Sequence, residues 1–499
     1  MSQVTDAAPL TGEEYLESLR DGRAVFIDGE RVEDVTEHPA FRNSARSVAR
    51  LYDALHDPDQ SDLLLGVDRL GITTHKFFMP SYSAEELLAA REAIAAWARL
   101  SYGYMGRTPD YKASFMATLG AAPEFYAPFE ANAEAWYRRY AEQVLFLNHV
   151  LINPPIDRNR EVHEVEDVYL HVVRERDDGI IVSGAKMLAT GSAITHATFV
   201  AQNSAVHLKE GKAEDYALVF IAPMDTPGKK LISRRSYELS AESPWDNPLS
   251  SRFDENDAFV IFDDAFIPWE NVLVYRDVEK ATGFYAASGF MNRYTLQSGT
   301  RLAVKFDFIC GLIAEALEAN GTSEFRGVKA QLGELMGWGS LMWALTSALA
   351  LDPQQGPGGM AIPKLEFAVL IRLFGAMAWP KVEEVVGQTL GGSPLVIPSS
   401  YRDLQNDELR PLIDRFYRGS TGSAVERIKL FKLLWDAVGS EFGARHTLYE
   451  RNYGGNHEQV RLDVLRFADS RGRLDEMRSL VEQCMAEYDL DGWTDGPWV

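Results

Sequence analysis

The sequence predicts an α+β protein of three parts. These are an N-terminal mainly helical domain over residues 1–153, a central β domain over 154–275, and a C-terminal helical bundle with a tail over 276–499. Apolar residues recur at three- and four-residue spacing in both outer parts, whereas runs rich in β-branched residues fill the middle. A chain of 499 residues is also too long for one hydrophobic core, so several packed units are expected.

Helical periodicity is strongest in two stretches of the first third. The stretch SAEELLAAREAIAAWARLSY combines strong helix formers with helical spacing, and Ser83 with Glu86 forms a capping box at its start. Thr11 and Glu14 form a similar box and predict an earlier helix. A second stretch, PEFYAPFEANAEAWYRRYAEQVLFLNHVL, is predicted to stay helical until about Ile152, because two prolines follow it.

The pattern changes to strands after these prolines. VYLHVVRE begins at Val168, Asp178-Gly179 is a turn signal, and IIVSGAKML follows it, which together predict a hairpin. Further strand-like runs are ATFVAQ, YALVFIAP and AFVIFDDAFIP. They predict a β domain that ends near Val274.

Long amphipathic runs resume after Asn292. They are RYTLQSGTRLAVKFDFICGLIAEALEA, EFRGVKAQLGELMGWGSLMWALTSALAL, KLEFAVLIRLFGAMAW and SAVERIKLFKLLWDAVGSEF, the last with a capping box of Ser423 and Glu426. DPQQGPGGM, from Asp352 to Met360, interrupts them as a predicted loop. Four long helices predict a C-terminal bundle.

Charge and cysteine content exclude several classes of function. The net charge of -23, from 73 acidic and 50 basic residues, argues against nucleic acid and anionic membrane as partners. The two cysteines, Cys310 and Cys484, argue against a disulfide framework and against cysteine-ligated zinc or iron–sulfur centres. The N-terminus lacks a signal-peptide pattern, and no apolar stretch reaches about 18 residues, so a cytoplasmic protein that does not span a membrane is expected.

Arg107, Tyr111 and His149 form the sharpest candidate constellation. A guanidinium can hold a carboxylate or phenolate through two parallel hydrogen bonds, a phenol can donate to the same oxygen, and an imidazole can take or give its proton. The plain structural alternative is a surface arginine, a packed tyrosine and a core histidine. The segment INPPIDR that follows His149 is rigid and can face a planar ligand, or it can be an interdomain linker.

Three segments rich in small residues are weaker candidates. Thr190, Gly191 and Ser192 in ATGSAITH can offer donors to a heteroaromatic or phosphate group, or can form a simple turn at a strand end. QTLGGSP and YERNYGGNHE each hold a glycine pair, which permits close approach of a ligand or of another subunit and equally fits a helix C-cap.

Other familiar motifs are missing or incomplete. The histidines show no metal spacing, and DENDAF resembles a calcium loop only loosely, so no metal is expected. The sequence has neither GxGxxG at a strand–helix junction nor GxSxG, which argues against dinucleotide-binding and α/β-hydrolase folds.

Together these segments resemble a known family. GRTPDYKASFMATLG, NHVLINPPIDR, GAKMLATGSAITH, SSRFDENDAFVIFDDAFIPWENV and LYERNYGG occur in the order found in the oxygenase component of 4-hydroxyphenylacetate 3-monooxygenases, which are two-component flavin-dependent phenol hydroxylases. The resemblance extends from Thr11 to Trp493 and looks nearest to actinobacterial members that act on 4-coumarate.

The resemblance implies an acyl-CoA-dehydrogenase-like fold and a homotetramer, or at least a dimer, with flavin sites near subunit boundaries. It implies reduced FAD supplied by a separate NAD(P)H-dependent flavin reductase. With dioxygen as co-substrate, a flavin 4a-hydroperoxide would ortho-hydroxylate a para-substituted phenol to a catechol. The implied substrates are 4-hydroxyphenylacetate, 4-coumarate, a tyrosine-like or carrier-bound compound, or a halophenol.

The resemblance also implies a role for individual residues of this sequence. Arg107 and Tyr111 match the family's substrate-binding pair, and His149 matches its active-site histidine, which also contacts flavin. The further residues that the resemblance places at the flavin are Val150, Leu151, Pro155, Ile156, Asp157, Arg158, Thr190, Gly191, Ser192, Arg451, Asn452, Tyr453 and Gly454, with Gln388, Gly391 and Gly392 serving a neighbouring subunit's FAD. Asn203 and Ser204 would contact substrate, although QNSAVH departs from the family pattern there.

Three alternative functions fit the sequence less well. An acyl-CoA dehydrogenase on the same fold needs a catalytic carboxylate over the flavin, and the sequence offers no clear one. A 4-hydroxybutyryl-CoA-type dehydratase needs cysteine ligands that two cysteines cannot supply. A non-catalytic helical scaffold would leave Arg107, Tyr111 and His149 without a purpose.

Overall fold

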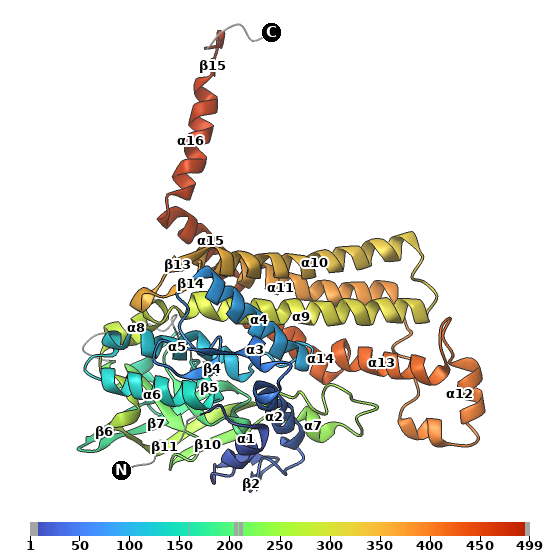
Figure 1. The fold of residues 1–499 in the computed structure, drawn as a ribbon, viewed down its shortest axis with the longest axis horizontal. Coiled ribbons are helices and arrows are strands. Elements are labelled where there is room, and N and C mark those ends of the chain that lie inside the picture. Colours follow the sequence, from blue (N-terminus) through green and yellow to red (C-terminus); the bar gives the residue numbers. More distant parts are fainter. Residues whose placement is uncertain (1–7, 158, 204–207, 209–212, 495–499) are drawn as a thin grey trace.

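The computed structural model describes residues 8–157, 159–203, 208 and 213–494. Helices come first, strands dominate the middle, and long helices follow, so the predicted α+β order is confirmed (Figure 1). The β-rich part lies on one side of the long C-terminal helices, and N-terminal helices pack against both. The boundaries between the three parts stay predictions.

The N-terminal helices begin where the sequence provides caps. The Thr11 hydroxyl accepts the backbone N–H of Glu14 at the start of α1, and Ser83 does the same for Glu86 at the start of α4. The elements here are α1 (Gly12–Ser18), α2 (Arg42–His56), α3 (Ser61–Leu64), the hairpin of β3 (Leu65–Val67) and β4 (Thr73–His75), α4 (Ala84–Leu100), the 3₁₀ helix η1 (Pro109–Lys112), α5 (Ala113–Ala121) and α6 (Glu130–Gln143).

The prediction of a helix until Ile152 is wrong. Helix α6 stops at Gln143, because Val144 adopts a left-handed conformation with φ of 53°. Residues Leu147–Val150 then form strand β5, which pairs in parallel with β8 (Ala197–Val200). Partner strands and burial override the local helical pattern here, as tertiary context commonly does.

The central part contains two sheets within the described residues. In one, the order is β2-β1-β10-β11-β7-β6, and in the other it is β12-β9-β8-β5. The strands are β1 (Val25–Ile27), β2 (Glu30–Val32), β6 (His171–Arg176), β7 (Gly179–Thr190), β9 (Leu218–Pro223), β10 (Lys229–Ser233), β11 (Asp257–Pro268) and β12 (Val272–Tyr275). The N-terminal third therefore contributes β1, β2 and β5 to the sheets and is not purely helical.

The long C-terminal helices α9 (Phe290–Ala319), α10 (Arg326–Leu351) and α11 (Leu365–Thr389) lie side by side (Figure 1). The predicted loop over 352–360 instead holds strand β13 (Pro353–Gln355), which pairs with β14 (Ala361–Pro363). The remaining helices are α7 (Tyr237–Ser240), α8 (Val278–Ala287), α12 (Arg410–Phe416), α13 (Ala424–Val438), α14 (Glu441–Asn452), α15 (His457–Ser470) and α16 (Arg473–Ala486).

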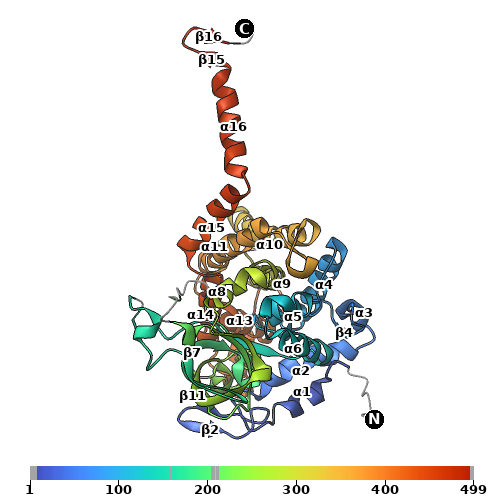
Figure 2. The same ribbon diagram turned by 90° about the vertical axis from the view of Figure 1, so that its left-hand side faces the viewer.

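Helix α16 projects away from the rest of the molecule (Figure 2). It buries none of its residues, and a short hairpin of β15 (Tyr488–Asp489) and β16 (Gly492–Trp493) follows it. Met477, Leu480, Val481 and Met485 lie at helical spacing on this arm and are at least half exposed. No helix in the described part of the chain has the length and apolar character needed to cross a membrane.

Candidate active site

The structure brings Arg107, Tyr111 and His149 together. The guanidinium carbon of Arg107 lies 3.9 Å from the centre of the Tyr111 ring. The ring of His149 lies 5.9 Å from that of Tyr111, between centroids. Tyr111 is buried, and the other two are partly buried. Three side chains from two segments that are about forty residues apart in the sequence therefore share one site.

Local structure explains how this site is held. Pro109 occupies the first position of η1, where its fixed φ and missing N–H suit a helix start. Tyr111 follows within this buried turn. His149 lies opposite Phe199 in the parallel pairing of β5 with β8, so the sheet fixes its backbone.

Two polar atoms of this site have no hydrogen-bond partner in the described chain. Burial acts to lower the pKa of Arg107, but Tyr111, Tyr449 and Glu255 hold it above its ordinary value. Its Nη1 has no hydrogen-bond partner within the described chain, and neither does Nδ1 of His149. Buried polar groups are normally paired, so these two atoms point to a ligand.

His149 is a neutral imidazole in this setting. Burial lowers its pKa well below the usual range, and the positive charges of Lys112 and Arg107 lower it further. The sequence favoured a histidine that takes or gives a proton near neutral pH. In the structure its neutral ring is suited instead to forming hydrogen bonds.

Aromatic side chains line the site. Phe290 lies 6.3 Å from the His149 ring, and Tyr294 lies 6.3 Å from the Tyr111 ring, between centroids. Phe115 packs against Phe199 at 4.2 Å. An apolar surround of this kind strengthens electrostatic interactions inside the site.

The segments predicted to contact flavin flank this site. Val150 and Leu151 continue β5 and are buried, whereas Pro155 and Ile156 are exposed and Asp157 is partly exposed. Arg158 lies outside the described residues. The predicted flavin-contacting segment therefore begins at a buried strand end and continues into residues that are exposed to solvent.

Thr190, Gly191 and Ser192 lie at the end of β7. The Thr190 hydroxyl donates to Asp257 Oδ1 at 2.6 Å, and Gly191 has a φ of +70°, which favours glycine. The side chain of Ser192 is buried, and its hydroxyl has no partner among the described residues. This turn therefore retains a free donor, as the predicted ligand-binding turn requires.

Gln388, Gly391 and Gly392 do not join this site within one chain. They are exposed at the end of α11. Asn320, which follows the end of α9, donates to Ser393 Oγ beside the glycine pair. The aromatic site contacts the start of α9, and a 30-residue helix is about 45 Å long.

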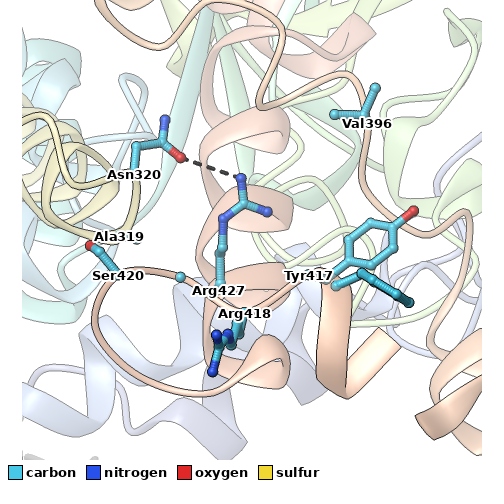
Figure 3. Close-up of a pocket in the computed structure, with 9 residues that line it drawn as sticks. Ala319, Asn320, Val396, Tyr417, Arg418, Ser420 and Arg427 are labelled. Carbon is cyan, nitrogen blue, oxygen red and sulfur yellow. Dashed lines mark hydrogen bonds between the residues drawn. The ribbon is translucent and has the colours of Figure 1, made fainter. Parts of the chain in front are cut away.

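A hollow of about 490 Å³ at this end of the bundle is lined in part by Asn320, and we call it the bundle-end hollow (Figure 3). Arg418 and Arg427 line it, and Arg427 donates to Asn320 Oδ1 at 3.3 Å. The hollow therefore offers guanidinium groups that connect through Asn320 to Ser393, next to the glycine pair, and it lies at the opposite end of α9 from the aromatic site.

The C-terminal segment over 451–454 reaches the site in part. Tyr453 stacks on Tyr449 with ring centroids 4.9 Å apart, and Arg107 Cζ lies 5.8 Å from the Tyr453 ring. Gly454 O accepts Arg372 Nε at 2.8 Å, whereas Arg451 and Asn452 are exposed. Asn203 is partly buried after β8, and Ser204 lies outside the described residues.

Charged residues of the DENDAF segment were not assigned to the site from the sequence. Arg445 of α14 bonds to Glu255 Oε2 at 3.2 Å and to Asp257 Oδ1 at 3.1 Å, and Arg234 bonds to Asp254 Oδ1 at 2.6 Å. The backbone N–H of Arg107 donates to Glu255. Glu255 and Asp257 are thus ion-pair partners that connect α14 to the site, whereas Asp254 pairs with Arg234.

Tyr449 and Tyr294 were also missed as wall residues. Tyr449 lies 5.3 Å from Arg107 Cζ, and its hydroxyl has no partner in the described chain. YERNYGGNHE was noted for its glycines, but spacing alone does not reveal that α14 packs beside η1.

The residues present fit a flavin. The unpaired Ser192 hydroxyl, the left-handed Gly191 and the unpaired Nδ1 of His149 lie on adjoining segments of the central sheets. They can donate to or accept from the edge of a planar heteroaromatic ring, and the aromatic surround suits its faces.

Solved structures share this fold. The oxygenase component of 4-hydroxyphenylacetate 3-monooxygenase, solved with FAD and 4-hydroxyphenylacetate, matches with a TM-score of 0.89 at 29% identity, over 95% of this chain and 99% of that one. An archaeal 4-hydroxybutyryl-CoA dehydratase from N. maritimus matches in fold at 19% identity, with a TM-score of 0.84 over 98% of this chain and 97% of that one. The predicted acyl-CoA-dehydrogenase-like fold class is thereby confirmed.

Fold and site together define a flavin-dependent aromatic monooxygenase. The 4-hydroxyphenylacetate 3-hydroxylase N-terminal family matches residues 11–274, and its C-terminal counterpart matches residues 281–482. The chain belongs to this 4-hydroxyphenylacetate 3-hydroxylase family.

Relatives in the family have different named roles. The pyoverdin chromophore biosynthetic protein PvcC of Pseudomonas aeruginosa is 55% identical over 498 residues, covering 100% of this chain and 99% of that protein. The oxygenase component of 4-nitrophenol 2-monooxygenase from a Rhodococcus species is 50% identical over 495 residues, covering 98% and 94%. The sequence-based recognition of the family is confirmed.

Proposed function

We propose that this chain is the oxygenase component of a two-component system that ortho-hydroxylates a para-substituted phenol with reduced FAD and dioxygen. The observation that carries the proposal is the buried cluster of Arg107, Tyr111 and His149, in which Arg107 Nη1 and His149 Nδ1 have no partner within the described chain. Such a cluster suits an oxygen atom that carries negative charge.

The cluster would bind the phenol by its oxygen. Arg107 and Tyr111 donate to that oxygen, and the neutral imidazole of His149 holds its orientation. Phenolate character raises electron density at the ortho carbon, which makes this carbon the nucleophile. Phe290 and Tyr294 pack the ring and exclude water.

The flavin would lie along His149–Leu151 and Thr190–Ser192. Bound there, reduced FAD supplies two electrons and, with dioxygen, an electrophilic oxygen. Ser192 Oγ and the backbone of Gly191 would hold the edge of its ring. A separate NAD(P)H-dependent flavin reductase would deliver the reduced cofactor.

We propose a homotetramer in which subunits complete one another's flavin sites. The distance along α9 supports this, because Gln388, Gly391 and Gly392 would have to serve the FAD of another subunit. Arg418 and Arg427 in the bundle-end hollow suit a diphosphate there. The exposed apolar residues of α16 are a second reason to expect assembly.

The substrate is proposed to be a phenol with a para side chain, such as 4-hydroxyphenylacetate, 4-coumarate or a tyrosine-like compound. The names of the relatives support the phenol class and differ in the compound. Asn203 would contact the para substituent, so the segment after β8 would set the preference.

An oxygen-labelling experiment tests this function. The protein is loaded anaerobically with reduced FAD and mixed with ¹⁸O₂ and each candidate phenol, while absorbance is followed by stopped flow and products by mass spectrometry. One labelled oxygen in a catechol product is expected. Oxidation of the flavin that yields only hydrogen peroxide with every phenol would overturn the proposal.

A matched variant completes the design. Arg107→Met should retain flavin binding and give peroxide in place of catechol, because the phenol is no longer held. Catechol formation by this variant at the wild-type rate would remove the cluster from the proposed mechanism.

A further inference from the structure

Lys112 is a buried basic residue beside the proposed phenol site. It is the last residue of η1, directly after Tyr111, and it is 2% exposed. Its Nζ makes no hydrogen bond or ion pair within the described chain and lies 4.1 Å from the centre of the Tyr111 ring. Buried lysines are rare and are normally paired.

The amine of Lys112 packs against the same aromatic ring as Arg107. Arg107 Cζ lies 3.9 Å from the centre of the Tyr111 ring and Lys112 Nζ lies 4.1 Å from it, so both groups contact the tyrosine that is proposed to bind the phenol. The charged and titratable groups that face Lys112 are Arg107 and Tyr111 from its own segment, His149 from β5, and Glu255 before β11.

The neighbours favour an uncharged amine in the free protein. Burial lowers the pKa of Lys112 well below its usual range and Arg107 lowers it further, while Glu255 acts in the opposite direction. His149 is a poor proton acceptor here, because the same cations and burial lower its own pKa. The amine of Lys112 is a second nitrogen base beside the Tyr111 ring that can accept a phenolic proton.

We infer that Lys112 is a catalytic residue that accepts the proton of the bound phenol. The O–H bond of the phenol breaks, a new N–H bond forms at Nζ, and the products are an ammonium and a phenolate side by side. No other reactant is needed. The inference rests on the proposed function, since it assumes that a phenol binds at Arg107, Tyr111 and His149.

A chromophoric phenol tests the inference directly. 4-Nitrophenol is bound anaerobically to protein loaded with reduced FAD, at a pH about one below the ionisation of the free phenol. Absorbance reports the fraction bound as phenolate. Calorimetry in buffers of different ionisation enthalpy reports the protons released on binding.

The wild-type protein should bind phenolate and release almost no proton, because Lys112 retains it. Lys112→Met should bind mainly the neutral phenol, with at least a tenfold lower preference for phenolate. Lys112→Arg should bind phenolate and release about one proton per site, since an arginine is already charged. Lys76→Met, which removes an ammonium bound to the carbonyls of Asp62 and Leu63, is the control and should match the wild type.

Two results would overturn the inference while leaving phenol binding intact. One is phenolate binding by Lys112→Met as in the wild type, and the other is release of a full proton by the wild type. If the wild-type protein binds no 4-nitrophenol at all, the proposed function fails and the inference fails with it. Melting temperatures within a few degrees confirm that the variants are folded.

Discussion

His149 lies between two cationic side chains and apolar rings, and this setting determines its charge. Because its pKa lies well below 6.5, the imidazole is neutral across the usual assay range. We expect the ratio of kcat/KM between the wild type and His149→Gln to be constant from pH 8 to pH 6. Steady-state rates with excess reduced FAD measure it. A ratio that falls towards one as the pH passes 6.5 would show a titrating histidine instead.

The activity should depend more on the planar shape of the Arg107 side chain than on its charge. Its guanidinium sits against Tyr111 and has an unused Nη1. Arg107→Lys keeps the charge but loses the planar fork, so kcat/KM for a phenol should fall by about 10- to 100-fold, and Arg107→Met should fall further. Arg20→Lys, an exposed arginine far from the site in an ion pair with Asp34, serves as the control. Equal rates for both Arg107 variants would contradict this reasoning.

At the residue scale, spacing and chemistry predict a site of Arg107, Tyr111 and His149 because their side-chain types suit one oxygen atom, and the structure brings these three side chains together. Spacing and chemistry could not identify Tyr449, Tyr294 or Lys112, since proximity to that oxygen depends on how α14, α9 and η1 pack. The position of Gln388 in space could not be predicted either. The sequence does not show that the length and direction of α11 place this residue far from the site.

Helices α9 and α14 are joined by a buried ion-pair cluster. Glu450 bonds to Arg301 Nη2 at 2.8 Å and to Lys305 Nζ at 2.9 Å, and all three side chains are at most 2% exposed. Glu450→Gln leaves two buried cations poorly compensated, so we expect a loss of about 3–5 kcal/mol in the free energy of unfolding. Urea titration at pH 7 measures it.

The control and the pH dependence sharpen this prediction. Glu476→Gln on α16, in an exposed pair with Arg473, should cost about 0–1 kcal/mol.

Burial acts to raise the pKa of Glu450, but Arg301 and Lys305 hold it at about 2, below its ordinary 4.5. The stability it contributes is therefore present above about pH 4.5 and is lost as the pH falls towards 2. A difference between wild type and Glu450→Gln that grows on acidification would contradict the assignment.

At the element scale, capped and strongly periodic helices were predictable, as Thr11 and Ser83 show. The stretch before Ile152 was not, because leucine, phenylalanine and valine there suit either a helix or a buried strand. The left-handed Val144 and the edge offered by β8 decide between them, and neither is visible in a single stretch of sequence.

At the scale of the whole molecule, helix α16 presents a stripe of exposed apolar residues away from the rest of the fold. Met477, Leu480 and Val481 form part of a stripe on a helix that buries nothing. A chain that ends at Gly472 should therefore keep the melting temperature of its body within a few degrees and should sediment as a smaller assembly.

A double substitution tests whether the apolar stripe on α16, and not merely the length of the chain, drives assembly. Leu480→Glu with Val481→Glu should reproduce the smaller assembly, whereas Ser479→Glu on a neighbouring position should not. Analytical ultracentrifugation of all four proteins, wild type included, measures the masses. An unchanged mass for the truncated chain would remove α16 from the proposed assembly.

The parallel pairings of β1 with β10 and of β5 with β8 have a consequence for synthesis in the cell. Val25 pairs with Leu231, and Leu147 pairs with Ala197. A nascent chain leaving the ribosome exposes β1 long before its partner strand exists, and contacts between distant segments form slowly. The first third should thus bind chaperones during translation. When expressed alone it should aggregate, because β1 and β5 lack their partner strands β10 and β8.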